Sequence, residues 1–415
     1  MRFTSKLVHS DRWFGVQHGA LVKPVHPGVT YGYESTNELA AVFQGRQAGY
    51  TYGRQINPTV EALQRKVTAM ENGLATVCFG TGMAAIGTTI VALLKAGDHV
   101  VTSQYLFGNT ASLFQTFERH GIEVSFVDAT EVAHVEKALR PNTKMVFTET
   151  IANPRTQIAD LAGIGALCAK RSLLYVVDNT ITTPFLFQPA SVGAHLVINS
   201  LTKYIGGHGN ALGGAITDLG SFDWERFDNI LELYRAGNPA QWGINQIKKK
   251  GLRDFGASMA PDAAHRLSVG ADTLALRMAR CCESADRIAQ FLAGHPAVDR
   301  VYFPGLADHP QHEQSKAWFK YHGAILSFEL RADLDCFDLL DAMNLVVKAT
   351  HLGDLRTLAL PVAHTIFYEV GPERRAQMGI SDHLIRMSVG IEDTDDLIED
   401  LQQAFDKTLS TSVDV

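Results

Sequence analysis

The sequence predicts an α/β fold, with a mainly parallel β-sheet covered by helices and then a smaller α+β domain. Short apolar runs alternate with helix-like segments over much of the chain. These runs are apolar throughout, which is typical of parallel strands buried on both faces. The composition changes near residues 259–261, and one long helical pattern with short strands follows. We therefore expect a large domain over residues 57–262 and a second domain over 263–415.

The N-terminal residues 1–56 are rich in Gly, Pro, Tyr and His and show little periodicity, which predicts an extended arm. The first helix is expected from Pro58, because proline is tolerated in a first helical turn. Helical spacing then continues through Val67. The large domain should contain strands over 99–102, 123–127, 144–148, 173–177 and 196–198, and helices over 110–120, 131–139 and 161–170.

The second domain should begin with a long helix over 263–292, with Gly270 as the candidate point for a break. Strands are expected over 297–302 and 323–330, a helix near 336–343, and a last helix over 394–405. No internal repeat or low-complexity segment is evident.

Composition excludes several classes of protein. The 415 residues include 37 basic and 44 acidic side chains, with a net charge of −7. This balance argues against nucleic-acid or membrane-surface binding, which favours a basic face. No apolar run approaches the roughly 20 residues that span a bilayer, and residues 1–10 lack the apolar core of a secretory signal. We expect a cytoplasmic protein.

Cysteine and histidine patterns do not predict a disulfide or a metal site. The five cysteines are odd in number and lack Cys-x-x-Cys spacing, so buried thiols in a reducing compartment are expected. The pair His309 and His312 lies in a Pro-containing segment with no third ligand in view, and we interpret it as structural.

The segment Ser200 to Gly209 is the most informative of the chain. Lys203 follows the apolar run 195–199 and is flanked by hydroxyl residues and glycines. Asp178 ends the apolar run 173–177, 25 residues earlier (203 − 178). Ligands of such sheets bind beyond the carboxyl ends of the strands. An amine that holds an aldehyde and an acid that keeps a pyridine nitrogen protonated predict pyridoxal 5′-phosphate (PLP) as cofactor.

A phosphate site is expected at Gly80-Thr81-Gly82-Met83, just before a helix that runs to about Lys95. Backbone N–H groups at a helix start bind phosphate, and glycine allows close approach. The motif is weak alone, but the hydroxyls of the Lys203 segment add further donors.

From about Tyr52 to Asp393 the chain resembles the Cys/Met-metabolism group of PLP enzymes, which includes cystathionine γ-synthases and lyases, methionine γ-lyases and O-acylhomoserine sulfhydrylases. The matching segments are Tyr52–Thr59, Gly80–Met83, Glu149–Pro154, Val177–Thr180, Ser200–Tyr204 with Gly207–Gly209, and Arg386–Gly390. The resemblance implies a fold-type-I (aspartate aminotransferase-like) large domain and a smaller α+β C-terminal domain.

The resemblance also implies roles for individual residues. Lys203 would bind the cofactor aldehyde and then move protons, and Asp178 would pair with the pyridinium nitrogen. Arg386 would clamp the substrate α-carboxylate, with Asn153 near that carboxylate. The phosphate would be bound by Gly82, Met83, Ser200 and Thr202.

In this family a tyrosine and an arginine of one subunit complete the phosphate site of its neighbour. Tyr52 and Arg54 stand at the matching positions. The resemblance therefore implies an arm over residues 1–56 that contacts a neighbouring subunit, in a homodimer that commonly pairs into a homotetramer.

Phe107 departs from the family pattern, since many relatives have a tyrosine there that stacks on the cofactor and protonates a departing thiolate. Phenylalanine keeps the stacking and removes the acid. The substitution favours a leaving group that departs as a stable anion, such as an acyl carboxylate. Asn109 replaces the cysteine of methionine γ-lyases, which also argues against methionine.

His351 replaces a serine that is common in the family. Its imidazole could orient or protonate the distal part of a substrate, or it could simply pack or bond the backbone. Thr350 precedes it where cystathionine-handling members have an acidic residue, so recognition of the distal amino group of cystathionine is not supported.

We therefore expect a PLP-dependent transferase or lyase acting at the γ-carbon of a substituted L-2-aminobutyrate. The first choice is γ-replacement on an O-acylhomoserine by a thiol, as in methionine biosynthesis and trans-sulfuration. The alternative is a γ-lyase acting on an amino acid such as canavanine, methionine or cystathionine. A non-catalytic PLP-binding regulator and an aminotransferase remain less supported, because the motif set is intact and matches neither.

Overall fold

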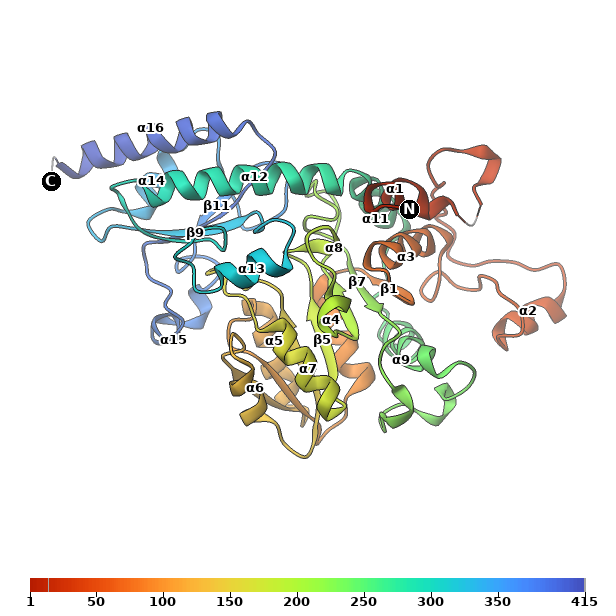
Figure 1. Ribbon diagram of the computed structural model, residues 1–415. Coiled ribbons are helices and arrows are strands. Elements are labelled where there is room, and N and C mark those ends of the chain that lie inside the picture. The colour runs from red at the N-terminus through yellow and green to blue at the C-terminus, as the bar shows by residue number, and fades with distance from the viewer. Residues whose placement is uncertain (14, 414–415) are drawn as a thin grey trace.

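The computed structural model describes residues 1–13 and 15–413, and it contains two β-sheets surrounded by helices (Figure 1). The larger sheet has seven strands in the order β1-β7-β6-β5-β4-β2-β3. Neighbours from β6 to β3 are parallel, and β7 is antiparallel to both β1 and β6. The strands are β1 (Ala75–Phe79), β2 (His99–Ser103), β3 (Glu123–Val127), β4 (Thr143–Glu149), β5 (Leu174–Asp178), β6 (Leu196–Asn199) and β7 (Gly214–Asp218). The predicted mostly parallel sheet is confirmed.

Apolar side chains of this sheet point into two separate cores. In β5, Tyr175 and Val177 join one apolar cluster, and Leu174 and Val176 join the other. Helices α3 (Pro58–Glu71) and α7 (Leu161–Arg171) supply the first cluster, and α4 (Gly82–Leu93) and α5 (Gly108–Glu118) supply the second. Burial on both faces explains why the strands are apolar throughout.

Other helices complete this part of the chain. They include α6 (Val132–Ala138), α8 (Thr183–Leu186), α9 (Trp242–Gln246) and α10 (Arg253–Phe255). The expected helix over 263–292 is instead two helices, α11 (Pro261–Asp272) and α12 (Leu274–Ala293), because the backbone at Thr273 leaves helical geometry. The break lies three residues beyond Gly270.

The second sheet has five strands in the order β10-β11-β12-β9-β8, of which only β10 and β11 are parallel. Helices α12, α14 (Cys336–Ala342) and α16 (Thr394–Val413) pack an apolar cluster onto it. Figure 1 shows α16 and α12 on the same side of this sheet. The strands are β8 (Val298–Tyr302), β9 (Ile325–Leu330), β10 (Val347–Lys348), β11 (Leu358–Pro361) and β12 (Leu384–Ser388), and helices α13 (His312–Trp318) and α15 (Pro372–Gln377) lie between them in sequence.

The N-terminal segment is not uniformly extended, contrary to expectation. It contains α1 (Phe3–His9) and α2 (Thr36–Phe43). Leu7 is 0% exposed and Phe3 packs against the same core, so α1 forms because it has an apolar face to bury. Helix α2 has no buried residue and projects away from the sheets (Figure 1).

Two further observations concern sequence expectations. All five cysteines are buried and free. Across residues 1–13 and 15–413, the helices are too short or too polar to cross a membrane.

Candidate active site

A cavity of about 500 Å³ lies beyond the carboxyl ends of β4, β5 and β6, where the sheet rule places ligands. Side chains from both sheets line it. It gathers most of the predicted site residues, namely Gly82, Met83, Phe107, Asn153, Asp178, Ser200, Thr202, Lys203, His351 and Arg386. Residues separated by up to about 300 positions in the sequence therefore meet in one site.

Lys203 contacts His351 within this cavity. Its Nζ lies 3.2 Å from Nδ1 of His351. Burial and the charge of Arg386 lower the pKa of Lys203 to about 8, and burial and the charge of Lys203 lower the pKa of His351 to about 4. At neutral pH the amine is the protonated partner, so Nζ donates to Nδ1 and the imidazole proton resides on Nε2.

Asp178 is held by Thr180, a residue that the sequence interpretation did not assign to the site. Oδ1 of Asp178 accepts from the backbone N–H of Thr180 at 2.9 Å and from its hydroxyl at 2.5 Å. Burial raises the pKa of Asp178 to about 6. A protonated pyridine nitrogen beside this carboxylate would restore its charged form. Asp178 therefore has the environment that its proposed partner requires.

The start of α4 lies directly against Ser200. Thr81 caps the helix by accepting from the backbone N–H of Ala84 at 3.0 Å. A Cβ added at Gly82 would lie 2.8 Å from Cβ of Ser200, so only glycine permits this approach. The hydroxyl of Thr202 is bonded to the backbone of Gly213. Free N–H groups at this helix start suit a phosphate.

Arg386 is a buried cation without an acidic partner among the described residues. It is 1% exposed, and its Nη2 donates to the backbone carbonyls of Thr350 at 3.0 Å and His351 at 2.9 Å. Its Nε is buried without a partner in the described chain, as is Oδ1 of Asn153. Unpaired buried polar groups are costly, so this end of the cavity suits a ligand that brings an anion to the guanidinium and a hydrogen-bond donor to the amide oxygen.

Glu149 is a second site residue that sequence reasoning did not assign. It lies opposite Asp178 in the register of β4 and β5, and its Oε1 accepts from the backbone N–H of Phe107 at 3.0 Å. Burial and the charge of Asp178 raise the pKa of Glu149 to about 8. It therefore holds Phe107 at the cavity wall in a largely protonated form. The parallel register of the two strand ends was the signal that could have identified it.

Tyr52 and Arg54 are not brought into this cavity. Both are exposed, the Arg54 guanidinium lies 5.4 Å from the centre of the Tyr52 ring, and Arg54 donates to the backbone carbonyl of Arg253. Their role in a neighbouring subunit remains a prediction.

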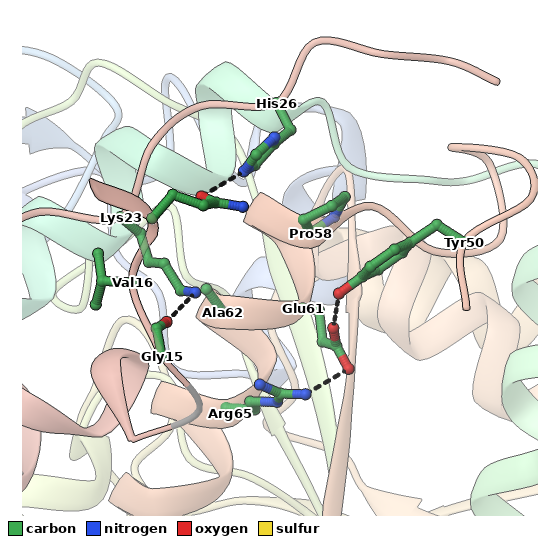
Figure 2. A pocket seen from close by; sticks show the side chains of 10 residues that line it. Gly15, Val16, Lys23, His26, Tyr50, Pro58, Glu61, Ala62 and Arg65 are labelled. Carbon is green, nitrogen blue, oxygen red and sulfur yellow. Dashed lines mark hydrogen bonds and ion pairs between the residues drawn. The ribbon is translucent and has the colours of Figure 1, made fainter. Parts of the chain in front are cut away.

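A second cavity, of about 460 Å³, lies between the N-terminal segment and α3 (Figure 2). Its polar groups bond one another: Glu61 pairs with Arg65 at 2.9 Å and accepts from Tyr50, and His26 bonds Gln17 at 3.1 Å. It contains none of the predicted site residues. These polar groups therefore have hydrogen-bond partners within the wall, whereas the Lys203 cavity contains buried polar atoms without a partner among the described residues.

The residues of the Lys203 cavity fit PLP chemically. They provide an amine with a lowered pKa, a buried carboxylate, a glycine-lined helix start and unpaired buried donors and acceptors. In the same order, these features suit the aldehyde, the pyridine nitrogen and the phosphate of the cofactor, and the carboxylate of the substrate.

Comparison with known proteins agrees with this chemistry. Residues 4–406 match the family model described as Cys/Met metabolism PLP-dependent enzyme. An L-methionine gamma-lyase of Fusobacterium nucleatum subsp. polymorphum is 38% identical over 94% of each chain, and an O-acetyl-L-homoserine sulfhydrylase of Corynebacterium glutamicum is 34% identical over 97% of this chain and 96% of its own.

A solved structure is similar over its whole length. It is a Campylobacter jejuni protein described as an O-acetylhomoserine (thiol)-lyase that contains N′-pyridoxyl-lysine-5′-monophosphate. The TM-score is 0.92 at 31% identity, covering 98% of this chain and 100% of that one. Relatives of similar identity thus differ in activity, and identity alone does not select one. The chain belongs to the Cys/Met-metabolism family of PLP-dependent enzymes, and PLP is its cofactor.

Proposed function

We propose that this enzyme acts at the γ-carbon of an L-2-aminobutyrate whose leaving group is attached through oxygen. The first candidate reaction is replacement on an O-acylhomoserine by a thiol. The observation that carries the proposal is the cavity wall at Phe107, which offers an aromatic face without a phenolic proton.

The α-amino acid end of the substrate is assigned to Arg386 and Asn153. The buried guanidinium lacks an acidic partner among described residues, and a substrate carboxylate would supply it. Unpaired Oδ1 of Asn153 is an acceptor and would take a hydrogen bond from a donor of the bound ligand, such as its amino group. This arrangement selects α-amino acids and leaves the γ-substituent free to point along the remaining wall.

Lys203 is assigned to cofactor attachment and proton transfer. When bound, PLP stabilises the negative charge that develops on the substrate carbons. Asp178 keeps the pyridine nitrogen protonated. With its pKa lowered to about 8, the Lys203 amine can both accept and return protons near neutral pH.

Departure of the γ-substituent then depends on its own basicity. A carboxylate leaves as a weakly basic anion and needs no acid at Phe107, whereas a methylthiolate is a stronger base and benefits from protonation. His351 does not supply this acid readily, since its pKa lies near 4 and the proton on Nε2 is buried. Both facts favour an oxygen-linked substrate.

A second candidate is γ-elimination from an oxygen-linked amino acid, canavanine being one example. The observation in its favour is that similar relatives include lyases, such as an L-methionine gamma-lyase and a cystathionine gamma-lyase, which differ from it in the leaving group. Under this alternative the leaving group would again depart without an acid at Phe107. The remaining carbon chain would be released as a keto acid and would not accept a thiol.

The homo-oligomer is also part of the proposal. Tyr52 and Arg54 are exposed and unused in the Lys203 cavity, which supports their contribution to the site of a second copy. The arm over 1–56, the boundaries 57–262 and 263–415, and a cytoplasmic location stay proposals, the last supported by five buried free thiols.

The test is product analysis by mass spectrometry with purified holoenzyme. O-acetyl- and O-succinylhomoserine would be supplied with cysteine or sulfide, beside canavanine, methionine and cystathionine. A thioether or homocysteine from an O-acyl substrate is the expected result. Formation of 2-oxobutyrate from canavanine alone would select the second candidate. Turnover of methionine faster than of every oxygen-linked substrate would refute the proposal.

A further inference from the structure

Glu71, the last residue of α3, is a buried carboxyl that no step above uses. It is 0% exposed. Its Oε1 accepts from Nδ2 of Asn199 at 2.6 Å and from Nδ2 of Asn179 at 3.2 Å. Both asparagines are also 0% exposed. The carboxyl therefore lies in the core with amides as its hydrogen-bond partners.

These asparagines are sequence neighbours of the cofactor-site residues. Asn179 follows Asp178 at the end of β5, and Asn199 precedes Ser200 at the end of β6. On the cavity side the same two strand ends are joined by Thr180, whose hydroxyl bonds Asp178 and accepts from the backbone N–H of Ser200 at 2.8 Å. The ends of β5 and β6 are thus linked twice, once through Thr180 and once through Glu71.

Two hydrogen-bond acceptors remain without a partner in the link through Glu71. Oε2 of Glu71 and Oδ1 of Asn199 are both buried and without a partner among the described residues. One proton on Oε2 would give the carboxyl a donor for the Asn199 carbonyl, while Oε1 goes on accepting from Nδ2 of the same amide. An acid and an amide are complementary in this way, whereas an ionised carboxylate leaves two buried acceptors facing no donor.

The surroundings also oppose a charge on Glu71. It lies at the carboxyl end of a 14-residue helix, where the helix dipole disfavours an anion. Burial raises its pKa to about 7, against the two asparagine hydrogen bonds and with no contribution from a charged side chain.

We propose that Glu71 carries a proton in the folded enzyme and is a positioning residue that holds Asp178 and Ser200 in register for the cofactor. The inference rests on the assignment of those two residues to the cofactor and is independent of the leaving group. It concerns cofactor binding, so a wrong substrate assignment would leave it intact.

The test compares Glu71→Gln with Glu71→Ala in the full-length chain. Glutamine reproduces the donor and acceptor of the protonated acid, so its dissociation constant for PLP, measured by equilibrium dialysis, should stay within about threefold of wild type. Alanine removes the acceptor of Nδ2 of Asn199 and one of the two acceptors of Nδ2 of Asn179, which keeps the Phe187 carbonyl, and it should weaken PLP binding about tenfold or more. Infrared spectra of the apoprotein at neutral pH should show a protonated carboxyl band that Glu71→Gln loses.

Asp218→Asn is the matched control. Asp218 is also 0% exposed, has a buried Oδ2 without a partner in the described chain, and its pKa is raised by burial to about 7. It pairs with Leu196 at the opposite end of β6 from Ser200. Asp218→Asn should leave PLP affinity unchanged. The proposal is overturned if Glu71→Gln weakens PLP binding as much as Glu71→Ala, if Asp218→Asn does so equally, or if no carboxyl band is lost in Glu71→Gln.

Discussion

Nζ of Lys203 and Nδ1 of His351 lie 3.2 Å apart, and they connect the two sheets within the candidate active site. Lys203 follows β6 of the larger sheet, and His351 lies between β10 and β11 of the smaller one. The neutral imidazole accepts from the amine and directs it. The interaction makes His351 a partner of the lysine, whereas the sequence left open a contact to substrate and a role in packing or backbone bonding.

Substitutions at His351 should separate these two roles. In His351→Asn the amide oxygen can replace Nδ1 as acceptor for Lys203, and in His351→Gln the carbonyl lies nearer the position of Nε2. We expect His351→Asn to keep near-wild-type kcat and His351→Gln to lose about tenfold, because the latter lacks the acceptor. Steady-state kinetics checks this, together with the pH dependence of the absorbance of the lysine-bound cofactor. The reverse order, or a change confined to KM, would assign His351 to substrate.

The sequence predicted the main candidate residues of the site, but it did not predict the residues that hold them in place. Lys203 and Asp178 were predictable because strand ends of a parallel sheet converge, and the apolar runs before them are unambiguous. Glu149 and Thr180 were not assigned, since their roles depend on strand register and on a hydroxyl that bonds a side chain two residues away. Glu71 could not have been found from spacing, as a helix end meets two asparagines more than 100 positions away.

The fold was likewise predicted from the sequence only in part. The parallel strands were expected, but the antiparallel β7 and its edge partner β1 were not, because their neighbours are fixed by tertiary pairing between residues far apart. Helix α1 was missed in a segment without long periodicity. Its formation depends on burial of Leu7 against a core that other elements create.

Phe107→Tyr should widen the leaving-group range. A phenol at this wall would provide an acid for thiolates, so turnover of methionine should rise about tenfold or more relative to wild type. Turnover of O-acetylhomoserine should change little, as its leaving group needs no proton. The two rates are measured on the same preparation, with Phe107→Leu as a control that alters the ring without adding an acid. Equal changes in both rates would show that the hydroxyl is not used.

The stability of the apoenzyme should fall as pH rises from about 6.5 to 8. The pKa is raised by burial to about 7 in Glu71 and Asp218 and to about 8 in Glu149. In this window the folded protein holds protons that the unfolded chain has lost, so unfolding is favoured as pH increases. Lys203, whose pKa is lowered to about 8, and histidines with lowered pKa, including His351, oppose part of this trend, because the unfolded chain holds protons that these groups have released in the folded protein. The net loss should be on the order of 1 kcal/mol.

Urea unfolding of the apoenzyme at several pH values measures this slope. Asp218→Asn should flatten it without changing cofactor affinity, because a neutral amide has no proton to lose. A stability that rises between pH 6.5 and 8 would contradict the assignment of buried, protonated carboxyls.

Gly82→Ala should weaken PLP binding, and Gly87→Ala in the same helix should not. A Cβ at Gly82 would lie 2.8 Å from Cβ of Ser200, inside any permitted contact, so the start of α4 must move away from the Ser200 segment. At Gly87 the nearest atom would be a side-chain carbon of Leu113 at 3.7 Å, an ordinary contact. Alanine there should stabilise the helix by about 0.5–1 kcal/mol. PLP dissociation constants and thermal unfolding of both variants check the pair, and equal PLP affinity in the two would show that the phosphate is bound elsewhere.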